Sequence, residues 1–475
     1  MTVDDLCYID ACEAIELFKG RKLSPVELLK AQIARAEEVE PKVNAFTSTR
    51  YEQALEQAVE IEKYYMKGTN SKLGALSGIT IALKNEHSMI GDNTTKGSLL
   101  LKDNIDTENA PITQLLLNAG AVIHAKTNTP EFCAAAFTRS RLHGVTVTPW
   151  NLEKSSGGSS GGSAASLACG TSTLATGSDI GGSIRIPASF NGVVGLKPSY
   201  GRVAEAAPLD ASNPYNHVGP LARSVRDCAL FFDVINGPHP SDITTVRPKL
   251  DVPTTFSDIR GMRIALCMNL GYFNVDPIVQ KNTQEAAEAL RELGAVVEEV
   301  DLPWDDQTKE AAGNNLSYMM GGALGNLVSD SEELLNDYVL EIITKSATLT
   351  QEDYFSSITV AAKMYTALSK VFEQYDALIC PTMAVPSIPA EGKKPYFESI
   401  LTDSMTYPFN MLSRCPVLSI PTGFSGDDVP TGLQIVGQTF QDLEVLRIGA
   451  NLERILDWRR GRRPLQKSTC GDDIL

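Results

Sequence analysis

The chain has 475 residues, of which 43% are hydrophobic and 21% charged, a balance typical of globular proteins and unlike fibrous or disordered chains. Its 42 Lys and Arg against 58 Asp and Glu give a net charge of −16, which repels nucleic-acid phosphates and anionic lipid heads. We therefore expect no nucleic acid and no membrane among its partners. The length accommodates two or three domains, or one large α/β unit.

Cysteine usage and the first residues indicate where the protein works. The nine cysteines are odd in number and never spaced C-x-x-C, which argues against a disulfide framework and a thiolate zinc site. Residues 1–10 carry acidic side chains where a secretory signal needs a basic start. No apolar run approaches membrane-span length. These features predict a reducing compartment and a cytoplasmic location.

Helices are predicted near the start of the chain. Ser24-Pro25-Val26-Glu27 combines a capping box with Pro at the first helical position, which predicts a helix over about 25–39. A second amphipathic helix is expected over about 51–67. Residues 78–83 then form a short β-like run that ends in Lys84.

Helical and strand patterns alternate further along the chain. Helices are expected over 112–119 and 283–293, and strands over 121–125, 263–267 and 295–300. Such alternation predicts an α/β fold with a mixed β-sheet core surrounded by helices. No internal repeat or long linker divides the chain. One large domain over residues 1–475 is the simplest interpretation.

The C-terminal part is expected to differ in character. Residues 314–408 are predicted to be mostly helical, with an irregular Pro-rich piece at 381–395, and to form a variable cap or pocket wall. The chain is predicted to close with a strand over 433–436 and an amphipathic helix over about 443–458.

The most informative segment spans residues 155–202 and begins SSGGSSGGSAA. Gly/Ser tracts are usually flexible linkers, but this one runs into a helical pattern at 164–168 and a β-like pattern at 171–176. Glycines around a serine allow backbone N–H groups to converge on an anion. Residues 179–183, Asp-Ile-Gly-Gly-Ser, therefore have the form of an oxyanion hole, with a tight structural turn as the alternative.

Other catalytic motifs fit this segment less well. A phosphate-binding loop needs Lys-Ser/Thr after its glycines, and none follows. Residues 158–162 match the G-x-S-x-G nucleophile elbow, but only His217 and His239 follow, each in turn-like sequence. The five histidines show no pair at metal-ligand spacing. A serine hydrolase without a usable His needs another base, for which Lys84 is the natural candidate, although a strand-end lysine is more often a solvated charge.

The motif resembles that of the amidase signature hydrolases. GGSSGGSAA at 157–165 is followed by GSDIGGSIRIPASFNGVVGLKPSYGRV at 177–203, inside a signature core of about 78–203. The agreement extends to the block at 415–436 and so spans nearly the whole chain. The resemblance implies one α/β domain and a Ser-cisSer-Lys triad that needs no metal and no cofactor.

Carried over residue by residue, the resemblance implies that Ser183 is the nucleophile, Ser159 the bridging serine and Lys84 the base. The Gly158–Ser159 peptide is then expected to be cis. An oxyanion hole is implied at the N–H groups of Ile180, Gly181, Gly182 and Ser183. A supporting shell is expected at Ser160, Asp179 and Arg185, with ordinary turn and cap hydrogen bonds as the alternative.

Two departures from the family pattern bear on function. The family commonly has Lys-Asp where this chain has Lys84-Asn85, so one nearby negative charge is expected to be missing. Residues 132–149 lack the polar pattern of the tRNA-dependent amidotransferase A subunit. Substrate contacts are expected at Cys133, Ala134 and Tyr407, with a plain core role as the alternative for Cys133.

The leading hypothesis is a free-standing amidase that hydrolyses aryl or aliphatic amides, and also esters, through a Ser183 acyl-enzyme. A carbamate (urethane) hydrolase with the same triad is the first alternative. A glutaminase A subunit of a tRNA-dependent amidotransferase is the second, and a non-catalytic binding relative is the third. The partner expected is a small-molecule substrate, and a homodimer is left open.

Overall fold

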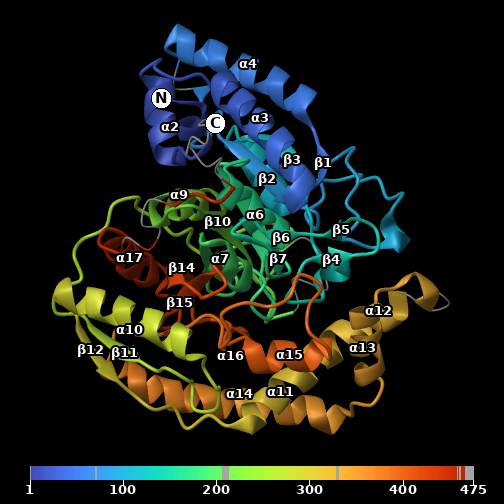
Figure 1. Cartoon of the computed structure of the whole chain (residues 1–475), viewed down its shortest axis with the longest axis vertical. Helices are drawn as coiled ribbons and strands as arrows, with labels where there is room; N and C mark the ends of the chain where they lie inside the picture. Colours follow the sequence, from blue (N-terminus) through green and yellow to red (C-terminus); the bar gives the residue numbers. More distant parts are fainter. Residues whose placement is uncertain are drawn as a thin grey trace, which may run out of the picture.

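An eleven-stranded mixed sheet runs through the computed structural model, which describes residues 2–69, 72–205, 213–327, 331–456, 458 and 462–465. In spatial order its strands are β1 (Phe46–Thr49), β3 (Val122–Thr127), β2 (Thr80–Lys84), β8 (Leu174–Ser178), β10 (Val218–Ala222), β9 (Val194–Lys197), β14 (Val417–Phe424), β15 (Pro430–Gly437), β13 (Ala377–Pro381), β11 (Arg263–Leu266) and β12 (Val296–Glu299). Helices surround the sheet (Figure 1), which makes this the single large α/β domain that the sequence predicts.

Two hydrophobic cores lie on opposite faces of the sheet. Along β11, Ile264 and Leu266 belong to one core while Ala265 and Cys267 belong to the other, because successive side chains of a strand point to opposite faces. The first core buries helices α2 (Ala11–Lys19), α3 (Pro25–Val43), α4 (Tyr51–Lys67), α5 (Pro111–Asn118), α9 (Val225–Ile235), α10 (Pro277–Glu292) and α17 (Asp442–Glu453). The second buries α11 (Asp306–Leu316), α13 (Asp337–Ser346), α14 (Gln351–Phe372), α15 (Tyr396–Asp403) and α16 (Pro408–Met411).

Helix α3 begins at Pro25 as its capping box predicts. Ser24 Oγ accepts from the Val26 N–H, and the Glu27 carboxylate accepts from the Ser24 N–H. The predicted helix over 51–67 coincides with α4, whereas the predicted C-terminal helix is shorter than expected and ends at Glu453. None of the helices that the structure describes combines the length and apolar character that a membrane span needs.

The prediction that residues 314–408 are mostly helical is wrong at one place. The segment contains α13 to α16, a single π-helical turn η4 (Ser317–Gly321) and helix α12 (Gly322–Leu327), but it also contributes β13 to the sheet. This fully buried strand is antiparallel to β15 and parallel to β11. The variable segment therefore helps to build the sheet as well as to cover it.

The sheet order places two strand ends side by side. Strands β2 and β8 are parallel neighbours although about ninety residues of chain separate them, and they end at Lys84 and Ser178. Helix α6 (Gly161–Cys169) precedes β8, and helix α7 (Arg185–Asn191) follows it. The carboxyl ends of parallel neighbours lie at one edge of a sheet, so the signature residues gather there.

Candidate active site

Lys84 and Ser159 are in direct contact inside the protein. Lys84 Nζ donates to Ser159 Oγ at 2.8 Å and to Ser178 Oγ at 2.7 Å, and all three residues are buried. Ser159 lies just before α6, and its peptide bond with Gly158 is cis, as the resemblance implies. The sequence motif thus brings a lysine from β2 and a serine from the Gly/Ser segment into one hydrogen-bonded group.

Ser183 is tied to the same group through its backbone. The Ser160 N–H donates to the Ser183 carbonyl at 3.1 Å, which sets the two serine-containing loops side by side. The Ser160 hydroxyl bonds to the backbone of Ser178. Gly158 is required here because a Cβ on it would lie 2.5 Å from the Phe137 carbonyl oxygen. Ser183 itself is 7% exposed and lines a cavity.

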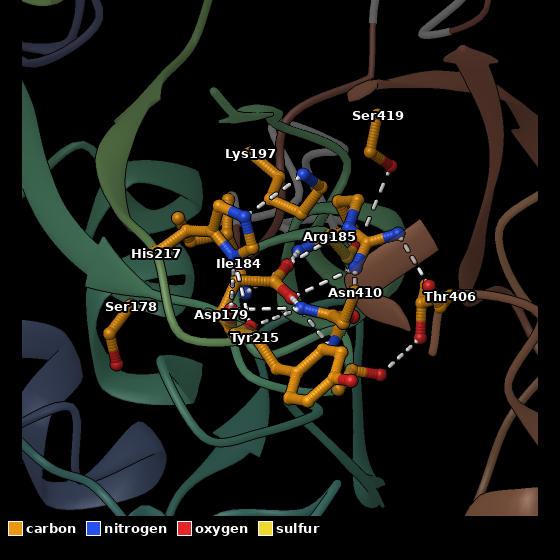
Figure 2. Close-up of polar contacts among 12 residues, drawn as sticks. Ser178, Asp179, Ile184, Arg185, Lys197, Tyr215, His217, Thr406, Asn410 and Ser419 are labelled. Atoms are coloured by element: carbon orange, nitrogen blue, oxygen red, sulfur yellow. Dashed lines mark hydrogen bonds and ion pairs between the residues drawn. The ribbon is translucent and has the colours of Figure 1, made fainter. Parts of the chain in front are cut away.

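Asp179 organises the loop that carries Ser183 (Figure 2). Its carboxylate accepts from the N–H groups of Gly182 and Ile184 and forms a two-point ion pair with Arg185. Burial alone would raise the pKa of Asp179, but the charge of Arg185 holds it well below its ordinary value. Asn410 donates to the same carboxylate at 2.8 Å, which locks it in place.

Arg185 is held in turn by the C-terminal part of the chain. Its guanidinium donates to the Thr406 carbonyl, to Gln434 Oε1 at 2.7 Å and to Asn410 Oδ1 at 2.7 Å. The arginine is fully buried, so these acceptors satisfy a charge that water does not reach. The sequence does not single out Asn410 and Gln434, because their distance along the chain hides this contact.

Not all four backbone groups of the expected oxyanion hole are available. The Gly182 N–H donates to Asp179 Oδ1 at 2.8 Å, so the expectation that it binds an oxyanion is wrong for this structure. The N–H groups of Ile180, Gly181 and Ser183 donate to no other group in the described part of the chain. A Cβ on Gly182 would collide with Thr406, whereas one on Gly181 would meet only the Leu316 side chain, at 3.7 Å.

A carboxylate that the sequence analysis missed lies beside Lys84. Glu86 Oε2 is 3.2 Å from Lys84 Nζ and accepts from Ser178 Oγ at 2.5 Å. The expectation that a negative charge is missing here is therefore wrong, because Glu86 supplies the charge that Asn85 lacks. Asn85 instead bonds to Thr95.

A narrow apolar cavity of about 40 Å³ opens at Ser183. Cys133 and Ala134 lie in its wall, and the Cys133 Sγ also contacts Thr129 Oγ1 at 3.2 Å. The opposite part of the wall comes from α11, the turn η4 and α13 to α15, through Leu316, Met320, Ile342, Phe397 and Ile400. None of the residues that line it is charged.

Comparison with known proteins decides the family. A family model described as Amidase matches residues 27–446. An acylamidase from Rhodococcus erythropolis is 34% identical over 476 residues, covering 96% of this chain and 98% of that protein. The glutamyl-tRNA(Gln) amidotransferase A subunit from Geotalea daltonii is also 34% identical, covering 95% and 98%. The chain belongs to the amidase signature family.

The structure of this amidase agrees with solved members of the family. A bacterial aryl acylamidase of the amidase signature family superposes with a TM-score of 0.87 at 29% identity, covering 95% of this chain and 97% of that one. With this family and these acylamidase relatives, the protein is an amide-hydrolysing enzyme. A Ser-Ser-Lys triad is characteristic of the family.

Tyr407 lies elsewhere in this amidase than expected. Its hydroxyl contacts that of Tyr272 at 2.8 Å and donates to the Leu401 carbonyl, and its ring packs near Phe273. It is absent from the described residues that line the cavity at Ser183. The expectation of a substrate contact at Tyr407 is therefore not met by its position in the fold.

A second buried base lies beneath the Asp179 loop of the amidase. Burial, and then the charge of Arg185, lowers the pKa of Lys197 to about 7, and burial lowers that of His217 to about 3. Lys197 Nζ lies 3.3 Å from His217 Nε2, and His217 Nδ1 faces the Asp179 carbonyl (Figure 2). Among the described residues, no group of three or more His, Cys, Asp or Glu could hold a metal ion.

Proposed function

We propose that the protein is a free-standing amidase that cleaves amides with apolar acyl groups through a Ser183 acyl-enzyme. The observation that carries this proposal is the contact of Lys84 Nζ with Ser159 Oγ beside Ser183 and an apolar cavity. Ser183 serves as the nucleophile, Ser159 as the bridging hydroxyl and Lys84 as the base. The hydrogen bond from Ser183 to Ser159 is part of the proposal.

The reaction follows from these roles. Ser183 Oγ forms a bond to the amide carbon while its proton passes to Ser159 Oγ, whose own proton passes to neutral Lys84 Nζ. The N–H groups of Gly181 and Ser183 stabilise the oxyanion, a contact worth about 3–4 kcal/mol per donor. The C–N bond then breaks, and the proton returns through Ser159 to the leaving amine. Water repeats the relay and releases the acid.

The cavity favours an acyl group without charge. Free glutamine carries an ammonium and a carboxylate, and burying either without a partner is costly. No lining residue offers an opposite charge to either group. The cavity therefore supports an aryl or short aliphatic acyl group, and it weighs against a glutaminase subunit, although a relative bears that name. Carbamates and esters present a similar carbonyl and belong in the same test.

Purified wild-type protein should be assayed without partner or metal on anilides, aliphatic amides, esters, aryl carbamates and glutamine. Ser183→Ala should abolish turnover, and Ser159→Ala should lower kcat by about 10²- to 10⁴-fold. Ser166→Ala is the matched control and should keep activity, because this buried serine of α6 donates its hydroxyl to the Ser163 carbonyl within its own helix. Turnover of glutamine alone, or activity that survives Ser183→Ala, would contradict the proposal.

A further inference from the structure

Glu86 lies where no general feature of a serine hydrolase requires an acid. After β2 ends at Lys84 the chain turns back, and the N–H groups of Glu86 and His87 both donate to the Lys84 carbonyl, at 2.7 and 3.0 Å. This turn returns the Glu86 side chain to the lysine from which it started. The Lys84 side chain is fully buried, whereas that of Glu86 is 17% exposed.

Three polar atoms close a triangle at this turn. Lys84 Nζ donates to Ser178 Oγ at 2.7 Å, Ser178 Oγ donates to Glu86 Oε2 at 2.5 Å, and Glu86 Oε2 lies 3.2 Å from Lys84 Nζ. Ser178 is therefore a fixed bridge between the lysine and the carboxylate. A lysine held in this way has one hydrogen of its ammonium on Ser159, one on Ser178 and the carboxylate in direct range.

The carboxylate carries its charge near neutral pH. Burial alone would raise the pKa of Glu86, but the charge of Lys84, followed by nearby cationic side chains and the Ser178 hydroxyl, holds it well below its ordinary value. Burial lowers the pKa of His87 to about 4, so this neighbour is neutral there. The titratable groups that face the pair or its cavity are His87, Lys96, Asp106, Glu108, Lys126, Cys133 and Glu205.

Glu86 also faces a cavity of its own. It lines a polar cavity of about 280 Å³ that shares no lining residue with the apolar cavity at Ser183. The carboxylate thus reaches Lys84 from a side other than that of the acyl group. A charge in this place acts on the lysine without touching the substrate.

We propose that Glu86 is a positioning residue for Lys84, which stabilises its ammonium form through the direct ion pair and through Ser178 and so sets the lower pH limit of catalysis. The proposal rests on the proposed role of Lys84 as the base. The lysine must be neutral to accept a proton, and an adjacent carboxylate opposes that neutral form. In return, a lysine that binds its proton more tightly is the stronger base once it is free.

The test is the pH profile of kcat/KM for the best anilide substrate. In Glu86→Gln the acid limb should move to lower pH by about one unit or more, because an opposite charge at this distance has been removed. Its plateau should fall by a few-fold, because the lysine becomes a weaker base. Glu86→Asp keeps the charge and should bring the limb back toward the wild-type pH. Glu86→Ala, smaller and also neutral, repeats the test if the glutamine variant does not fold.

Glu108→Gln is the matched control, because Glu108 is exposed and lines the same cavity but stands outside the triangle of Lys84, Ser178 and Glu86. Its acid limb should stay at the wild-type pH. An unmoved limb in both neutral Glu86 variants, with or without a loss of stability, would overturn the proposal, and so would an equal shift in Glu108→Gln. If instead wild-type activity does not depend on Ser183 or Lys84, the proposed function itself has failed.

Discussion

Asp179 binds more partners than any surface acid could hold in place. Its carboxylate faces two backbone N–H groups, Arg185 and Asn410, all buried. Removing one charge of a buried pair costs about 3–5 kcal/mol, because the other charge is left unpaired. We expect Asp179→Asn to lower the free energy of unfolding by this amount and to lower kcat, since the Gly182 N–H loses its acceptor. Urea unfolding and steady-state kinetics measure the two effects.

The control for this variant is Asp427→Asn. Asp427 pairs with Lys154 at 2.9 Å, but its side chain is 47% exposed. Exposed pairs of this kind contribute about 0–1 kcal/mol. Equal losses of stability in the two variants would show that the Asp179 network has no special place in the fold.

At Ala134 we predict a change of selectivity. Its side chain faces the narrow cavity at Ser183, so Ala134→Leu should exclude bulky acyl groups and still admit an acetyl group. Leu316→Ala, on the opposite wall, should have the reverse effect. A difference of one or two carbons in such a pocket is worth about 10-fold or more in kcat/KM. The ratio of kcat/KM for benzoyl and acetyl anilides measures it, and an unchanged ratio would show that the acyl group binds elsewhere.

At the scale of elements, Glu131 joins the cavity wall to the helices that cover it. It is buried in the turn η3 (Glu131–Cys133), and its carboxylate accepts from Ser98 Oγ and from the backbone and side chain of Asn336, the N-cap of α13. Tyr338 extends the link, since its hydroxyl accepts from the Glu131 N–H and donates to the Arg139 carbonyl. The variable segment is therefore fastened to the signature core at the start of α13.

Glu131→Gln should loosen this attachment. Hydrogen bonds to a charged group contribute about 1.5–3 kcal/mol each, and glutamine replaces one accepting oxygen by a donor. We expect faster hydrogen exchange at the first turn of α13, measured by mass spectrometry on the native protein. Asp337→Asn, next to it on the surface, is the control and should leave that exchange rate unchanged. Identical exchange in wild type and Glu131→Gln would contradict this role.

The elements that the sequence predicts best carry their signal locally. Helix α3 has its capping box, and α4 has a long amphipathic pattern, so both begin where expected. Strand β13 was missed because its five residues lie between the long helix α14 and a Pro-rich segment, and a short apolar run does not reveal its neighbours. Its place between β15 and β11 depends on chain that is distant in sequence.

At the scale of the whole molecule, a buried imidazole makes stability depend on pH. Burial lowers the pKa of His124 from 6.5 to about 4. Between these pH values the unfolded chain binds a proton that the folded protein does not, so this residue destabilises the fold as pH falls. We expect the free energy of unfolding of His124→Leu to depend less on pH than that of wild type, by about 1.4 kcal/mol per pH unit between these limits.

Urea unfolding at pH 4.5, 5.5 and 6.5, values chosen to span the window of about 4 to 6.5, tests this expectation. The partly exposed His239, which contacts Ser241, is the control, and His239→Gln should have the wild-type slope. Parallel curves for wild type and His124→Leu would show that His124 takes up its proton in the folded state as it does in the unfolded chain.

The candidate site shows the same limit of sequence reasoning as the fold. The positions of Lys84, Ser159 and Ser183 follow from a long motif, and the sequence also indicates the loop around Asp179. The directions of side chains and N–H groups do not follow from it, which is why the expectations for Tyr407 and for the Gly182 N–H are wrong. Glu86 was missed because a turn, and no spacing of residues, returns it to Lys84.

The order of the strands also governs when the enzyme can become active during its synthesis. Strands β1, β3, β2, β8, β10 and β9 meet the other five only where β9 pairs with β14. Because β14 and β15 leave the ribosome last among the described strands, β9 keeps an unpaired edge until then, and Arg185 waits for Asn410 and Gln434. A nascent chain therefore holds its complete serine loop without hydrolytic power, and it depends on protection from aggregation until the final strands arrive.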